Sequence, residues 1–111
     1  SSAKDLHHIL LANSLTADVW KKIGQTIAKF HHHQIYHHDL NIHNIMLDIE
    51  NKVWLIDFDK CGIRQGSKWK NSNMVRLKRS FEKEQRLRNI YWQLADWQIL
   101  ISAYNEAAMA N

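Results

Sequence analysis

The sequence predicts an α+β fold that is mostly helical and carries a small β-hairpin next to a polar loop. Apolar residues recur at helical spacing over residues 16–33 and again in the last third of the chain. Two short apolar runs, 45–47 and 53–56, flank a polar turn-like segment. The chain has 111 residues, no proline and three glycines, which favours one domain, residues 1–111, with long helices and few tight loops.

The first half of the chain predicts a helix followed by a loop. Residues 1–15 contain one short apolar run and end in a turn-like segment. Thr16 is a suitable N-cap for a helix that we expect to reach about His33. The apolar stripe of this helix, with spacings of four, four and three residues, consists of Val19, Ile23, Ile27 and Phe30. Residues 34–36 read as a short extended link, and residues 37–44 lack periodicity and indicate a loop.

The second half predicts a hairpin and two helices. Gly62 and Gly66 mark a loop after the hairpin. Asn73 is expected to cap a basic helix that runs to about Arg88, with a buried side formed by Met74, Leu77 and Phe81. A last helix from about 91 to 108 is expected to bury the face that carries Leu94, Trp97, Ile101 and Tyr104.

Composition limits the class of protein and its partners. The formal charge is +4 and the pI is about 9.3, which favours anionic partners such as nucleotide phosphates, nucleic acid or an acidic lipid surface. Cys61 is the single cysteine, so no internal disulfide forms and a reducing compartment is the simpler assumption. No apolar run approaches the ~18 residues of a membrane span, and residues 1–5 lack the start of a secretory signal.

The polar loop and the end of the hairpin carry the residues that indicate chemistry. Asp39 and Asn44 lie five residues apart in the loop, and Asp57 follows the last strand of the hairpin. Phosphoryl transfer from ATP needs metal ions held against the phosphates and a carboxylate that orients and deprotonates the acceptor hydroxyl. Mg²⁺ prefers hard oxygen ligands such as carboxylate and amide oxygens. We therefore predict Asp39 as the base and Asn44 and Asp57 as the ligands of Mg²⁺ and the binders of ATP.

The ordered set resembles the catalytic loop and metal motif of the protein-kinase-like superfamily. By this resemblance His37 leads the catalytic loop, residues 37–44, and holds it by hydrogen bonds, while residues 57–59 stand for the Asp-Phe-Gly metal motif. There are three departures. His38 replaces the usual Arg, which argues against activation by a phosphorylated loop. Asp59 replaces the Gly, and Asn41 replaces the assisting Lys, which argues against a protein substrate.

A narrower resemblance is to the bacterial 3-deoxy-D-manno-octulosonic acid (Kdo) kinase family. It is carried by Asp-Leu-Asn-x-His-Asn at residues 39–44 and by Asp-Phe-Asp at residues 57–59, and it covers roughly Val19 to Arg88. The resemblance implies transfer of phosphate from ATP to the 4-hydroxyl of Kdo in Kdo-lipid A, during assembly of the lipopolysaccharide inner core. It also implies a peripheral position at the cytoplasmic face of the bacterial inner membrane, with Asn41 and His37 supporting the loop.

The resemblance further implies that the chain is the carboxy-terminal lobe of a kinase-like fold. No nucleotide-covering loop, phosphate-binding strand Lys or partner Glu is recognisable before Leu15. We therefore expect that the amino-terminal nucleotide-binding lobe is missing from this chain, and that the chain alone binds ATP poorly and is inactive.

Other interpretations of these residues stay open. The activity could be that of another small-molecule kinase of the aminoglycoside type, or the chain could be a non-catalytic binding module. The basic stretch from Lys68 to Arg88 is either a solvated helix face or a contact for an acidic glycolipid or the membrane surface. Nucleic acid is disfavoured, because no aromatic-interleaved basic strand is present. The eight histidines invite a zinc site, but consecutive ones such as 31–33 point in different directions, and His43 has no role that the sequence indicates.

Overall fold

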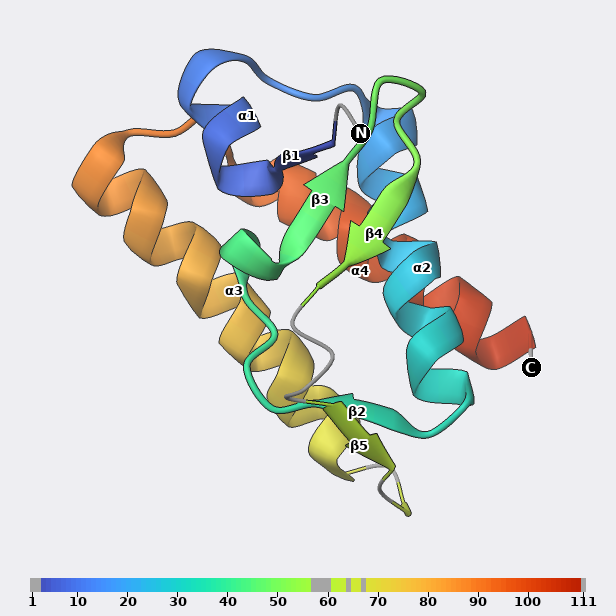
Figure 1. Cartoon of the computed structure of the whole chain (residues 1–111). Coiled ribbons are helices and arrows are strands. Elements are labelled where there is room, and N and C mark those ends of the chain that lie inside the picture. The colour runs from blue at the N-terminus through green and yellow to red at the C-terminus, as the bar shows by residue number, and fades with distance from the viewer. Residues whose placement is uncertain (1–2, 57–60, 64, 67, 111) are drawn as a thin grey trace.

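The computed structural model describes residues 3–56, 61–63, 65–66 and 68–110 and has the predicted α+β architecture (Figure 1). Its α-helices are α1 (Leu6–Ala12), α2 (Ala17–His32), α3 (Lys68–Arg88) and α4 (Leu94–Ala110). Its strands are β1 (Lys4–Asp5), β2 (Ile35–His37), β3 (Ile45–Leu47), β4 (Val53–Leu55) and β5 (Cys61–Ile63), and a short 3₁₀ helix, η1 (Ile42–Asn44), leads into β3. No helix in the described ranges is long and apolar enough to cross a membrane.

The predicted hairpin is confirmed and forms part of a three-stranded antiparallel sheet in the order β1-β3-β4. Its turn is closed by Asp48, whose Oδ1 accepts hydrogen bonds of 2.9 Å from the backbone N–H groups of Glu50 and Lys52. Asn51 completes the turn with a φ of 61°, a value that asparagine tolerates better than most residues. The tight turn brings β3 and β4 into the register Ile45↔Leu55.

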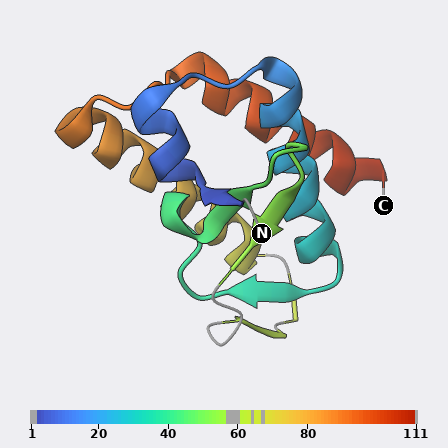
Figure 2. The same cartoon turned by 45° about the horizontal axis from the view of Figure 1, so that its top comes forward.

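A second, two-stranded sheet pairs β2 with β5, and it lies at the end of the molecule opposite α1 (Figures 1 and 2). His37 is opposite Cys61 in this pair. The expectation that Gly62 lies in a loop is therefore wrong, because Gly62 pairs with Tyr36 inside β5. Gly66 does lie outside the strand, with a φ of 88°.

The close packing of α2 against α4 explains why residue 24 is a glycine. A Cβ atom at Gly24 would overlap the backbone carbonyl oxygen of Leu100 and approach the backbone nitrogen of Tyr104 to 3.1 Å. Only a residue without a side chain allows this approach. The buried core spreads from this contact to all four helices and the three-stranded sheet, and it includes Trp20, Ile23, Ile45, Leu77, Phe81 and Leu100.

The first predicted helix is confirmed in α2, with Thr16 at its N-cap position. Helix α1 was not predicted. Asp5 caps it, because the Oδ1 of Asp5 accepts a hydrogen bond of 2.7 Å from the backbone N–H of His8.

The boundaries of the last two helices differ from the prediction. Helix α3 begins at Lys68, so Asn73 is not its cap but a buried residue in its second turn. Helix α4 begins at Leu94 rather than near Tyr91, and Leu94 is half exposed instead of buried. The predicted buried side of α3, Met74, Leu77 and Phe81, is confirmed, whereas the buried face of α4 is formed by Trp97, Leu100, Ala103 and Tyr104.

Candidate active site

The ring of His37 connects the catalytic loop to Ile56, the residue that precedes the predicted metal motif. His37 is the last residue of β2 and is 4% exposed. Its Nε2 donates a hydrogen bond of 2.8 Å to the carbonyl of Ile56, and its Nδ1 accepts one of 3.0 Å from the backbone N–H of Asp39. Both bonds are satisfied by a neutral imidazole with its proton on Nε2. The predicted hydrogen-bonding role of His37 in the loop is therefore matched by the geometry.

The carbonyl of Asp39 is held by two side-chain amides. The Nδ2 of Asn41 donates to it over 2.9 Å, and the Nδ2 of Asn44 donates to it over 2.5 Å. Asn41 also caps η1, because its Oδ1 accepts a hydrogen bond of 2.7 Å from the backbone N–H of His43. These bonds fix the backbone of the loop so that Asp39 and Asn44 lie together, as the sequence predicts.

The orientation of Asn44 leaves its amide oxygen for another ligand. The residue is 4% exposed, and its nitrogen is occupied by the carbonyl of Asp39. Within the part of the chain that the structure describes, no group donates a hydrogen bond to its Oδ1. An amide oxygen that accepts no hydrogen bond from the described residues is open to a cation, and it is a hard ligand of the kind that Mg²⁺ takes.

Asp57, together with Phe58 and Asp59, lies outside the described residues, so the metal motif stays a prediction. Ile56, the residue before Asp57 in the sequence, is held by two hydrogen bonds. Ile56 donates its N–H to the carbonyl of Asn44 over 3.0 Å and accepts the bond from His37.

A buried network connects the loop to the helical core, and sequence reasoning missed it. The hydroxyl of Tyr104 lies 2.6 Å from the Nδ1 of His31, whose Nε2 lies 3.2 Å from the Oδ1 of Asn73. The Nδ2 of Asn73 donates over 3.1 Å to the carbonyl of His37. One signal was available, because His31 continues the apolar stripe four residues after Ile27.

Burial sets the protonation states in this network. Burial, assisted by the nearby charge of Lys70, lowers the pKa of His31 from 6.5 to about 4, although the hydrogen bond with Asn73 acts in the opposite direction. Burial likewise raises the pKa of the Tyr104 hydroxyl. At neutral pH the Nδ1 of the neutral His31 ring therefore accepts a hydrogen bond from the Tyr104 hydroxyl, and its Nε2–H donates a hydrogen bond to the Oδ1 of Asn73.

Helix α3 holds the loop at a second point. The backbone N–H of Ile42 donates to the Oγ of Ser80 over 3.0 Å, and this hydroxyl donates in turn to the carbonyl of Leu77 over 2.7 Å. The loop is thus attached to α3 through Asn73 near its start and Ser80 near its end.

An open pocket of about 540 Å³ lies along the same stretch of α3. Two exposed arginines, Arg76 and Arg79, line it together with Tyr36, and neither arginine forms an ion pair with a described acidic residue. The ring of Tyr36 contacts the rings of His38 and Trp69, with centroids 4.6 and 5.4 Å apart. The pocket therefore offers two cations beside a row of aromatic rings. Its lining residue Tyr36 precedes Asp39 by three residues in the sequence.

The chain belongs to the lipopolysaccharide kinase (Kdo/WaaP) family, whose profile matches residues 2–104. The matched region is longer than residues 19–88, over which the sequence motifs indicated the resemblance. The match confirms that resemblance.

Individual relatives in this family are 3-deoxy-D-manno-octulosonic acid kinases. The chain is 48% identical over 104 residues to such a kinase from Vibrio vulnificus (strain YJ016), covering 94% of this chain and 44% of the relative. It is 50% identical over 103 residues to one from Photobacterium profundum, covering 93% and 44%. It is 48% identical over 105 residues to one from Vibrio cholerae, covering 95% and 45%. The chain thus spans less than half the length of the relatives that it matches.

Proposed function

We propose that the chain is the catalytic part of an ATP-dependent Kdo kinase that phosphorylates the 4-hydroxyl of Kdo in Kdo-lipid A during inner-core assembly. The observation that carries the proposal is the interlocked loop, in which Asn41 and Asn44 both hold the carbonyl of Asp39. Membership of the lipopolysaccharide kinase family and the printed activity of the relatives support the same reaction.

In this proposal the carboxylate of Asp39 orients the acceptor hydroxyl and takes its proton as the oxygen attacks the terminal phosphorus of ATP, whose bond to the bridging oxygen breaks so that ADP leaves. His37 and Asn41 are positioning residues that fix the backbone on either side of Asp39. Rigid positioning of this kind matters because phosphoryl transfer depends on alignment more than on covalent help from the protein.

Asn44 and Asp57 would hold Mg²⁺ against the ATP phosphates. The oxygen chemistry fits this ion, since an amide oxygen and a carboxylate are the hard ligands that Mg²⁺ takes. The Oδ1 of Asn44 accepts no hydrogen bond from the described residues, which supports its share of the site. When bound, the ion neutralises charge that develops on the phosphates.

We further propose that the chain is the carboxy-terminal lobe of a kinase-like fold and that a nucleotide-binding lobe completes the active enzyme, so that this chain alone binds ATP poorly. Its coverage of 44% of the Vibrio vulnificus relative supports this division.

The acceptor would approach from the pocket beside α3. Arg76 and Arg79 provide positive charge next to Tyr36, which suits the carboxylate of Kdo and the phosphates of lipid A. The basic surface of α3 also suits peripheral attachment to the cytoplasmic face of the inner membrane, where each basic residue near an anionic surface contributes about 1 kcal/mol.

A comparison of acceptors tests the proposed reaction. The full-length kinase that contains this chain is incubated with ATP, Mg²⁺ and either Kdo-lipid A or an aminoglycoside, and the products are analysed by mass spectrometry. We expect one added phosphate on the Kdo residue and none on the aminoglycoside. Phosphorylation of the aminoglycoside alone would assign the chain to another small-molecule kinase, and transfer to neither acceptor would favour a binding module.

A further inference from the structure

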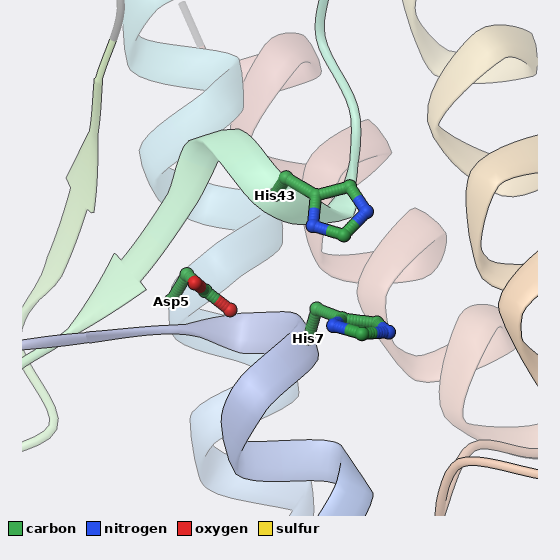
Figure 3. Close-up of side chains that lie close together, drawn as sticks. All are labelled: Asp5, His7 and His43. Atoms are coloured by element: carbon green, nitrogen blue, oxygen red, sulfur yellow. The ribbon is translucent and has the colours of Figure 1, made fainter. Parts of the chain in front are cut away.

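Three side chains that can bind metals meet where the amino-terminal segment contacts the catalytic loop. Asp5 ends β1, His7 lies in the first turn of α1, and His43 lies in η1. Each offers one ligand atom, and these atoms all lie within 4.8 Å of one another. Figure 3 shows the carboxylate of Asp5 directed toward His7, and the ring of His43 lying next to the ring of His7. We propose that these residues form a binding site for a divalent transition-metal ion, with Zn²⁺ as the preferred occupant.

A buried carboxylate behind His7 supports the assignment independently. The Nε2 of His7 lies 2.9 Å from the Oε1 of Glu84, whose side chain is 8% exposed. Donation from Nε2 to this carboxylate leaves the lone pair on Nδ1, facing away from Glu84. Histidines that bind metals commonly donate their other ring N–H to a carboxylate, which fixes the tautomer and the ring orientation. His7 is therefore oriented as a ligand would be.

Of the remaining two side chains, Asp5 is also partly fixed, whereas His43 is exposed. The Oδ1 of Asp5 accepts the N–H of His8 over 2.7 Å as the N-cap of α1, which leaves Oδ2 for a cation. The ring of His43 lies beside that of His7, with centroids 4.6 Å apart and planes tilted by 48°. The tilt excludes face-to-face stacking of the two rings. Small side-chain rotations would bring the three atoms to the separations of a tetrahedral site.

The ligand set selects the class of metal. Two imidazole nitrogens and one carboxylate oxygen suit Zn²⁺ and its neighbours, whereas Mg²⁺ prefers oxygen ligands alone. Three protein ligands leave a fourth tetrahedral position for water. This site is thus distinct from the proposed Mg²⁺ site, although His43 is adjacent to Asn44.

The position of His43 gives the site a consequence for the loop. His43 lies between Asp39 and Asn44, and its backbone is already held by Asn41. A metal ion bound here would connect β1 and α1 to η1 across 36 residues of sequence, from His7 to His43. The bound ion would therefore stabilise the segment that carries Asn44.

Metal titration of the purified protein tests the site. Metal-free protein is titrated with Zn²⁺ by calorimetry, and Co²⁺ is added separately to record the visible absorption of a tetrahedral complex. We expect one ion per chain. His43→Ala should weaken binding at least tenfold and abolish the Co²⁺ bands, and Asp5→Asn, which keeps a capping oxygen, should also weaken binding. Circular dichroism checks that each variant is folded.

His8→Ala and His33→Ala are the matched controls, since both histidines are exposed and neither belongs to the cluster. They should bind Zn²⁺ with unchanged affinity. Equal binding by the His43→Ala variant, loss of binding in the His33→Ala variant, or no binding by the unaltered protein would each overturn the proposal. None of these measurements depends on kinase activity.

Discussion

The side-chain amide of Asn73 donates a hydrogen bond of 3.1 Å to the backbone carbonyl of His37, from 36 residues away in the sequence. The same amide accepts a hydrogen bond from His31, which is in turn bonded to Tyr104. A single buried residue of α3 therefore links α2, α4 and the first residue of the catalytic loop. The stability of the helical core and the position of Asp39 depend on the same contacts.

Removing this amide should destabilise the protein more than its size suggests. Asn73→Ala leaves the Nε2–H of His31 and the carbonyl of His37 without their partner. Each buried unsatisfied group costs about 1–3 kcal/mol, so we expect the free energy of unfolding, measured by urea denaturation, to fall by about 2–6 kcal/mol. Asn71→Ala, an exposed change in the same helix, should alter it by less than about 0.5 kcal/mol. Equal stability of the two variants would contradict the network.

The titration of His31 should make stability depend on pH. Its pKa is lowered from 6.5 to about 4 in the folded chain, so between these pH values the unfolded chain binds more protons. The free energy of unfolding therefore falls as the pH is lowered through this range, by about 3 kcal/mol in total. Denaturant unfolding at a series of pH values measures the slope.

The His31→Gln variant has no titrating group at this position. The dependence of its free energy of unfolding on pH should therefore lack this contribution, whatever its stability at neutral pH. His33→Gln, at an exposed position, should retain it. Carboxylates such as Glu84, whose pKa is lowered in the folded state because Arg88 and His7 outweigh the effect of burial, contribute mainly at lower pH. An unchanged slope above pH 4.5 in the His31→Gln protein would show that His31 is not the titrating group.

Adding one methyl group at Gly24 should separate two helices. The Cβ of Gly24→Ala would overlap the carbonyl oxygen of Leu100, which is backbone and cannot rotate away. We expect a loss of about 1–3 kcal/mol in the free energy of unfolding, the usual range for overpacking. The exposed neighbour Gln25→Ala serves as the control. A Gly24→Ala protein as stable as that control would show that α2 and α4 are further apart than described here.

The pocket arginines should affect the acceptor and not the nucleotide. Arg79→Ala removes a cation that we assign to the anionic groups of Kdo-lipid A. Hydrogen bonds to charged groups contribute about 1.5–3 kcal/mol, so the KM for Kdo-lipid A should rise roughly 10–100-fold while the KM for ATP is unchanged. Arg86→Ala, also exposed on α3 but outside the pocket, is the matched control. A rise in the KM for ATP alone would place Arg79 elsewhere in the reaction.

Local patterns predicted the elements whose stabilising contacts are local. The stripe through Ile23 and Ile27 predicted α2, and two apolar runs on either side of a polar segment predicted the hairpin, because in both cases the signal lies in neighbouring residues. Asn73 misled the prediction for α3, because its partners lie 36 and 42 residues away. As a short polar residue it is typical of an N-cap, and only the tertiary structure shows that its side chain is used inside the core.

The candidate site was predictable in part for the same reason. The spacing of Asp39 and Asn44 within one loop indicated that they lie together, and the structure places them so. The cluster of Asp5, His7 and His43 was not predictable, since pairing of β1 with β3 is what brings its two halves together. A two-residue strand leaves no periodic signal in the sequence.

The most direct test of the account is the turnover number of an Asp39→Asn variant of the full-length kinase, measured with Kdo-lipid A, ATP and Mg²⁺. The change keeps the size of the side chain and the backbone carbonyl that Asn41 and Asn44 hold, but it removes the base. Asp18→Asn, an exposed substitution of the same kind in α2, is the control. We predict that kcat falls about 10²–10⁴-fold in the Asp39→Asn enzyme and is unchanged in the control. An Asp39→Asn enzyme with the turnover of the control would contradict the assignment of the catalytic loop.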